Sequence, residues 1–203
     1  MLAAALWLPA SFFLWAVFAS VVVWPAARIS DVVLPRLLPQ AIAKVEQAGP
    51  MLEIETRLLT QVGPEQRSGV LVLTANPLVY AWCLAVFAGL VMATPLAARQ
   101  RLLQFAVGFA GLWLVVGWGA VFDALKLLGF DAGPLGAAAI EQAGLSLDAV
   151  ALGYQFGYLI LPAVMPILLW ILLNRGFLET LVGWHAELGD DAAGRSDGQK
   201  DSA

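Results

Sequence analysis

Four long apolar stretches constrain this sequence more than any other feature, because each is long enough to cross a bilayer. The hydrocarbon core of a membrane takes about 20 consecutive apolar residues in helical form. Lipid offers no hydrogen-bonding partner to an open backbone, so each isolated stretch is expected to be a helix. The sequence therefore predicts an integral membrane protein, mainly α, with four transmembrane helices at Leu2 to Trp24, about Pro77 to Pro95, about Leu102 to Leu128 and about Ala149 to Leu173.

Composition also favours a lipid environment. The chain is 61% hydrophobic and 13% charged, whereas soluble domains have about 45–50% apolar and about 25% charged residues. The net charge is -4, and no basic run indicates binding to nucleic acid. The single cysteine excludes an intramolecular disulfide and a multi-cysteine metal site. We therefore predict the lipid bilayer as the chain's surroundings, with no cofactor and no metal.

The predicted membrane domain covers residues 1–186, and a polar tail rich in Gly, Ser and Asp follows at 187–203. The tail has no apolar periodicity and is expected to be disordered. The first span could instead be a cleaved signal peptide. It lacks a basic first segment, however, and its apolar run exceeds the usual length of about 7–15 residues.

Basic residues near the span ends predict the orientation. Arg99 and Arg101 lie in a short connection, and Arg175 follows the fourth span directly. Positively charged short loops usually stay in the cytoplasm. We expect both termini to be cytoplasmic and residues 25–76 and 129–148 to be external.

The external insert at 25–76 has two predicted parts. Residues 29–49 have apolar positions at helical spacings despite Pro35 and Pro39, which predicts a helix that rests on the membrane surface or on the other spans. From Leu52 to Leu58 apolar and charged residues alternate, and a Gly- and Pro-containing turn and a short apolar run follow. This pattern predicts a β-hairpin at about 51–75 that needs support and has an edge open to strand addition. A short helix is also expected around 134–143 in the second external loop.

No catalytic signature is present. Cys83 and His185 are the only residues that could form a cysteine–histidine pair, and the predicted topology puts them on opposite sides of the membrane. Cys83 is expected to be a small buried hydrophobe. We predict no catalytic residue and a chain that is not an enzyme.

Polar residues do gather at the predicted external ends of three spans, where they form a candidate interaction patch. Asp123 and Lys126 are three residues apart and can pair on one helix face. The competing interpretation is an interfacial ion pair with tyrosines that only anchor the helices. The Gly153–Gly157 spacing permits close helix approach, and two prolines are expected to kink the fourth span. The candidate patch is Asn76, Tyr80, Asp123, Lys126, Tyr154, Gln155 and Tyr158.

Three segments, "NPLVYAW", "GWGAVFDALKLLGF" and "ALGYQFGYLILPAVMPILLWILLNRGFL", resemble the exosortase H-associated membrane proteins. The resemblance extends from about Met51 to Leu178, is weaker over the first span and is absent from the tail. It implies a protein of the Gram-negative inner membrane that accompanies an exosortase, a membrane cysteine enzyme that processes carboxy-terminal sorting signals. It brings no catalytic residue with it, and the patch residues correspond only to family-like positions.

These observations lead to one preferred function and two alternatives. The preferred function is a non-enzymatic accessory that docks the exosortase or its sorting-signal substrate at the external membrane face. The first alternative is a small transporter or channel component that uses the Asp–Lys–Tyr patch. The second alternative, a membrane enzyme using the same patch, has no spacing that specifies a reaction.

Overall fold

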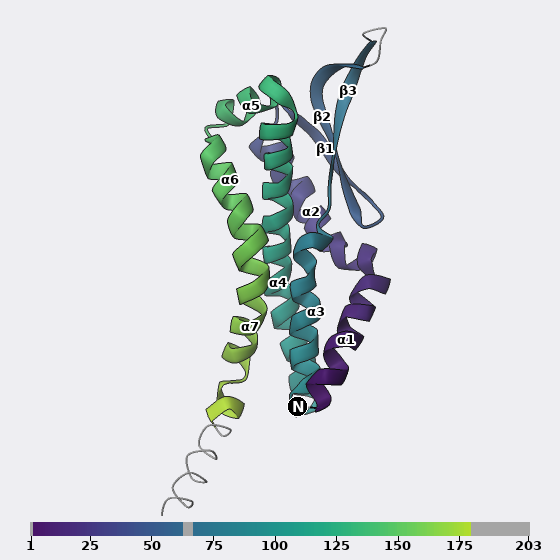
Figure 1. The fold of residues 1–203 in the computed structure, drawn as a ribbon, viewed down its shortest axis with the longest axis vertical. Coiled ribbons are helices and arrows are strands. Elements are labelled where there is room, and N and C mark those ends of the chain that lie inside the picture. The colour runs from purple at the N-terminus through teal and green to yellow at the C-terminus, as the bar shows by residue number, and fades with distance from the viewer. Residues whose placement is uncertain (1, 63–66, 180–203) are drawn as a thin grey trace, which may run out of the picture.

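Long helices run side by side in this protein, and a small antiparallel sheet packs beside one end of them (Figure 1). The computed structural model describes residues 2–62 and 67–179. In chain order, the elements are α1 (Leu2–Val17), α2 (Ala19–Leu37), β1 (Ile42–Ala48), β2 (Met51–Val62), β3 (Arg67–Ala75), α3 (Leu78–Ala93), α4 (Ala98–Lys126), the π-helical η1 (Leu127–Asp131), α5 (Gly133–Gln142), α6 (Leu147–Gln155), the π-helical η2 (Phe156–Ile160) and α7 (Leu161–Leu173).

The structure does not confirm four membrane spans. Among the described residues, Ala98–Asp131 and Leu147–Leu173 are long and apolar enough to cross a membrane. The helices Ala5–Val17 and Ala19–Leu37 add a third span only if this pair, bent by 68°, counts as one. α3 has 16 residues, about 24 Å of helix, which is shorter than a hydrocarbon core about 30 Å thick. An apolar run in the sequence specifies hydropathy but not the direction of the helix axis.

The predicted surface helix at 29–49 is wrong in its second half. α2 ends at Leu37, and residues Ile42–Ala48 form strand β1 instead. Pro39 cannot donate the backbone hydrogen bond that a continuing helix needs. β1 obtains its hydrogen bonds from β2, where Val45 pairs with Ile54.

The sheet has the order β1-β2-β3, and all neighbours are antiparallel. Gly49 makes the turn between β1 and β2 with φ 63°, a left-handed conformation that favours glycine. The predicted hairpin is confirmed as β2 and β3. Its register shifts between Glu55 and Leu59. At this bulge the Thr56 hydroxyl donates to the Leu71 carbonyl over 2.7 Å, which stabilises the local break in the ladder.

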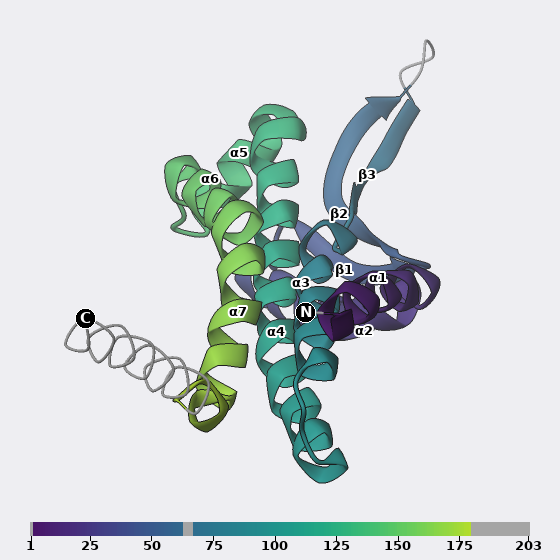
Figure 2. The same ribbon diagram turned by 60° about the horizontal axis from the view of Figure 1, so that its bottom comes forward.

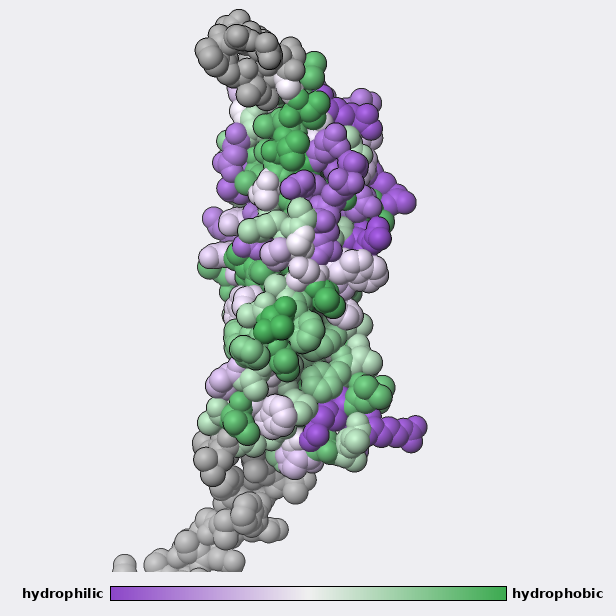
Figure 3. All heavy atoms as spheres, turned by 90° about the vertical axis from the view of Figure 1, so that its right-hand side faces the viewer, coloured by the Kyte–Doolittle hydropathy of each residue, from purple (hydrophilic) through white to green (hydrophobic). Residues whose placement is uncertain are grey.

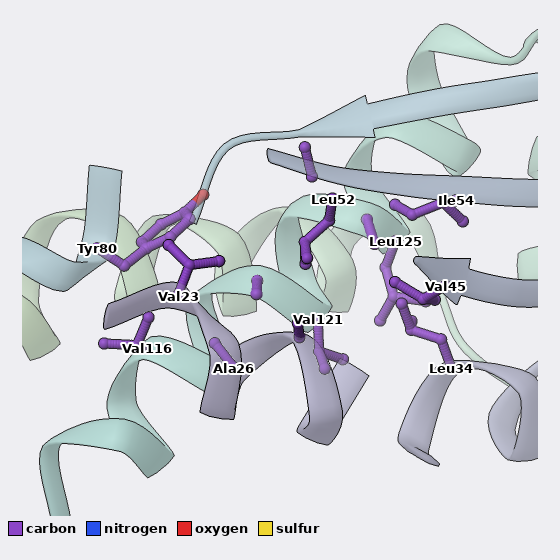
Figure 4. Close-up of a cluster of buried hydrophobic side chains, with 14 of the residues drawn as sticks. Val23, Ala26, Leu34, Val45, Leu52, Ile54, Tyr80, Val116, Val121 and Leu125 are labelled. Atoms are coloured by element: carbon purple, nitrogen blue, oxygen red, sulfur yellow. The ribbon is translucent and has the colours of Figure 1, made fainter. Parts of the chain in front are cut away.

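The alternation predicted from Leu52 to Leu58 is also confirmed. Leu52 and Ile54 are fully buried, whereas Glu53 is exposed. The inner face of the sheet packs on α2 and on the end of α4, where Leu34 and Leu125 belong to the same core cluster (Figure 4). The hairpin is therefore supported by helices of its own chain.

The remaining predictions concern the last part of the chain. The short helix expected at 134–143 is confirmed as α5. The fourth predicted span departs from α geometry at η2, directly before Pro162 at the start of α7. Cys83 is fully buried, as expected. His185 and the tail at 187–203 lie outside the described residues.

Candidate functional site

Tyr80 is the centre of the candidate patch. Asn76 and Pro77 lead from β3 into α3, and the Asn76 side-chain oxygen accepts a hydrogen bond from the Leu78 backbone N–H over 3.2 Å. This places Tyr80 in the first turn of α3, where its ring is 1% exposed. The ring lies directly on the backbone of α4 at Gly119, because a Cβ at that position would come within 2.9 Å of Tyr80 Cδ2. Glycine at this position therefore makes room for the buried tyrosine.

Two further tyrosines extend this cluster from α6 and η2. Tyr154 and Tyr158 stack with ring centroids 5.8 Å apart and an interplanar angle of 7°. The edge contact between Tyr80 and Tyr158 has a centroid distance of 6.2 Å and an angle of 82°. Edge and stacked geometries are the favourable arrangements of aromatic pairs. The three rings thus join α3 to the helix that follows α5.

Asp123 belongs to the same cluster. Its half-buried carboxylate lies within electrostatic range of the Asn76 backbone N–H, the Tyr80 hydroxyl and Lys126. These polar neighbours offset part of the cost of removing water from a partly buried carboxylate.

The predicted ion pair between Asp123 and Lys126 is not the one that forms. Lys126 Nζ instead lies 2.8 Å from Asp131 Oδ2. The π-helical η1 begins directly after Lys126 and ends at Asp131, and its i to i+5 spacing brings Asp131 over Lys126. The Asp131 side chain is 50% exposed, so this pair requires less desolvation than a pair with Asp123. Lys126 thus lies at the edge of the cluster, and Gln155 is exposed and takes no part in the ring contacts.

The sequence reasoning missed the aromatic residues that hold this site together. Trp118 stacks on Phe122 with centroids 4.6 Å apart, and its indole N–H donates to the Gly153 carbonyl over 3.0 Å. Gly153 and Gly157 leave no room for a Cβ against Phe122 and Trp118, respectively. The close helix approach predicted from the glycine spacing is therefore present, and it fixes the distance between α4 and α6.

Comparison with known proteins decides the family. A family model described as "Exosortase H-associated membrane protein" matches residues 1–177. The chain belongs to the exosortase H-associated membrane proteins. The match includes residues 1–50 as well as the region where the resemblance is strongest. No curated protein and no solved structure matches the chain.

A second polar cluster of this exosortase H-associated protein lies at the other end of the helices, and it was also missed. Gln104 of α4 and Asn174, which follows α7, exchange side-chain hydrogen bonds of 2.8 Å and 3.2 Å. The Trp170 indole N–H donates to the Thr94 hydroxyl over 2.9 Å. Gln104 within an apolar stretch was the available sequence signal. Its partner is 70 residues away, too far for a local pattern to identify.

The described residues offer little for metal or cysteine chemistry. No group of three or more His, Cys, Asp and Glu residues within 2–62 and 67–179 is placed to hold a metal ion. Cys83 is buried in the helical core. The distinctive features of this family member are therefore a tyrosine-rich polar cluster and the sheet that leads into it.

Proposed function

We propose that this chain is a non-enzymatic accessory of an exosortase-type protein-sorting system, and that it docks the exosortase or its substrate at the external face of the inner membrane. In this proposal both termini are cytoplasmic and the sheet is external. Membership of the exosortase H-associated family supports the link to such a system. The observation that carries the docking role is an exposed apolar surface on the β2–β3 hairpin.

This apolar surface, which we call the hairpin stripe, consists of Leu59, Val70 and Val72. Leu59 pairs with Val70 and Glu55 pairs with Val72, so the three apolar residues share the sheet face that points away from the core. They are 65%, 50% and 51% exposed, respectively. The hairpin extends away from the helices in both ribbon views (Figures 1 and 2). The stripe therefore lies on the part of the sheet that is least covered by the chain itself.

The same face is polar nearer the helices. Lys44 Nζ lies 2.9 Å from Glu46 Oε1 and 3.7 Å from Glu55 Oε2, and the hydrogen bond to Glu46 raises the pKa of Lys44. In Figure 3 a hydrophilic zone separates an apolar band over the helices from the apolar atoms of the hairpin. Lipid can cover the band over the helices. The separate stripe fits a protein partner, because contiguous exposed apolar surface marks interaction sites.

The stripe is connected to the tyrosine cluster. β3 ends at Ala75, and Asn76 and Tyr80 follow at once. A partner bound along β3 would end beside Asn76 and the half-buried Asp123, next to Tyr158, which is 43% exposed. Tyr80 itself is buried. This connection supports a single docking surface made of the stripe and the cluster.

Co-purification from membranes tests the proposal. Deleting the hairpin is unsuitable because Leu52, Ile54 and Ala75 are core residues, so we would change the stripe alone to L59T, V70T and V72T. Threonine is β-branched, a shape that strands favour, and it has nearly the same shape as the two valines. Truncation of a well-packed interface side chain costs about 1 kcal/mol or more, so the triple variant should lose at least about tenfold in exosortase or substrate recovery.

The matched control removes exposed apolar surface elsewhere, with V32T on α2 and L135T on α5. These residues are 51% and 60% exposed, and the control variant should retain recovery and substrate processing. Protection of buried Cys83 from a thiol reagent would verify that both variants are folded. Unchanged recovery and processing in the folded stripe variant would show that the docking proposal is wrong.

A further inference from the structure

A groove at the end of the helices opposite the sheet has no role in the proposed docking. Its volume is about 480 Å³, and it lies between the start of α4 and the end of α7. One part is apolar and includes Leu103, Val107 and Phe177. Another part is polar and includes Gln104 and Asn174. The groove is therefore amphipathic and suits a ligand with a polar end and an apolar end.

The polar part of the groove is built from a fixed amide pair. Gln104 and Asn174 are 7% and 3% exposed and bond to each other in both directions. The Gln104 amide N–H groups also reach the Leu173 carbonyl, and those of Asn174 reach the Trp170 carbonyl. The amide donors are thus used within the chain, and oxygen acceptors with second lone pairs remain. Such a floor suits ligand hydroxyl groups, while an anionic group needs other partners.

Arginines supply positive charge around the groove. Arg99 is in the first turn of α4, one helical turn before the groove residue Leu103. Arg175 directly follows Asn174, and both arginines are exposed. Neither makes an ion pair within residues 2–62 and 67–179.

Arg101 adds a third positive charge and is held against the chain. One of its terminal nitrogens lies 3.4 Å from the carbonyls of Thr94 and Leu96, and its buried Nε has no acceptor in the described chain. Within the described segments 93–107 and 170–179, Glu179 is the one acidic residue beside these three arginines. The charge of this end is therefore positive and complementary to an anion.

The groove also borders exposed apolar surface, as a headgroup site next to lipid-facing helices would. Exposed apolar residues lie next to the groove on both helices. They are Leu102 on α4 and Ile171 and Leu172 on α7, and they are between 38% and 71% exposed. In Figure 3, hydrophilic atoms reappear below the apolar band at this end of the molecule, and Figure 2 turns this end toward the viewer. Basic pockets between helices at a membrane surface bind anionic headgroups.

We propose that this groove binds one anionic phospholipid. The phosphate lies by Arg99 and Arg175, headgroup hydroxyls face the amide pair of Gln104 and Asn174, and an acyl chain lies along Leu103 and Val107. The site does not depend on the docking function, because it is at the opposite end of the helices from the hairpin.

Native mass spectrometry of the purified full chain in detergent tests this site. The probes are phosphatidylglycerol, phosphatidylcholine with the same acyl chains, and inorganic phosphate. We expect the chain to retain phosphatidylglycerol at least about fivefold more strongly than phosphatidylcholine, which corresponds to one basic contact. The double variant R99Q/R175Q should lose about 25-fold in phosphatidylglycerol affinity at about fivefold per arginine, with little change for phosphatidylcholine.

Two further variants separate charge from shape. R28Q removes an arginine that lies over the Trp24 ring on α2 and should leave phosphatidylglycerol binding unchanged. V107W fills the groove without changing charge and should weaken phosphatidylglycerol binding. Protection of the buried Cys83 thiol from labelling verifies folding in each case.

Three results would overturn the proposal. The first is equal binding of the two lipids, and the second is full phosphatidylglycerol binding by folded R99Q/R175Q or V107W. The third is displacement of phosphatidylglycerol by equimolar inorganic phosphate, which would indicate a simple anion site without a lipid component.

Discussion

Replacing Gly119 by alanine is the sharpest test of the tyrosine cluster. Gly119 is buried in α4, and a Cβ added there would lie 2.5 Å from Tyr80 Cδ1 and 2.9 Å from Cδ2. Favourable carbon–carbon contact needs about 3.5–4.0 Å, so the ring would have to retreat by about 1 Å. Tyr80 is 1% exposed and already touches Tyr158, which leaves it little space for that movement.

The cost of G119A follows from this overpacking. Forcing a methyl group into a packed core costs about 1–3 kcal/mol. Alanine also favours a helix over glycine by about 1 kcal/mol, which would hide part of the loss. G111A provides the matched control, because its Cβ would lie 3.4 Å and 4.0 Å from the Leu169 methyl carbons, at ordinary contact distances. The difference between the two variants therefore measures the clash with Tyr80.

The single cysteine of the chain makes the measurement simple. Cys83 is fully buried in α3, three residues after Tyr80, so heating exposes its thiol to a fluorogenic reagent when the helices separate. We expect G119A to melt below G111A by about 2–4 °C for each kcal/mol of clash in a chain of this size. The clash should also disappear when Tyr80 is shortened, so Y80A/G119A should be no less stable than Y80A alone. Equal melting of G119A and G111A would show that the Tyr80 ring does not rest on α4.

Two other substitutions test the contacts between helices. Q104L leaves a polar group of the buried Asn174 amide unsatisfied and should lower the free energy of unfolding by about 1–3 kcal/mol. The double variant Q104L/N174L should cost less than the sum of the two single changes. Additive losses, measured as melting followed by Cys83 labelling, would contradict the pairing. W118F keeps an aromatic ring on α4 but removes the 3.0 Å hydrogen bond to the Gly153 carbonyl. It should lower the free energy of unfolding by about 0.5–1.5 kcal/mol. Unchanged melting of W118F would show that this bond adds nothing to the α4–α6 contact.

Local patterns were enough to predict much of this protein. The alternation around Leu52 and Ile54 predicted the buried face of β2, and the structure confirms it. The Gly153–Gly157 spacing predicted close helix approach, and both glycines do face aromatic rings of α4. Each of these patterns lies within a few residues of sequence, where side-chain direction follows directly from helix or strand geometry.

The candidate patch was predicted in part for the same reason. Residues at the ends of neighbouring helices must lie at similar depth, which brings Tyr80, Asp123 and Tyr154 together. The predicted partner of Lys126 was wrong because a π-helical turn follows α4 and brings Asp131 within 2.8 Å of the lysine, and the sequence pattern gave no sign of that turn. Gln155 was included by depth alone, and depth does not specify which side of a helix a residue occupies.

By itself, the sequence determined that the chain is a mainly helical membrane protein with a hairpin inserted before its second long apolar stretch. Hydropathy and periodicity are properties of neighbouring residues, so they can be read along the chain. Only the tertiary structure decided that the chain bends at Phe18, that residues Ile42–Ala48 become a strand, and that Gln104 pairs with Asn174. The physical reason is that these features depend on partners distant in sequence: a strand takes its hydrogen bonds from another strand, and a buried amide takes them from another helix.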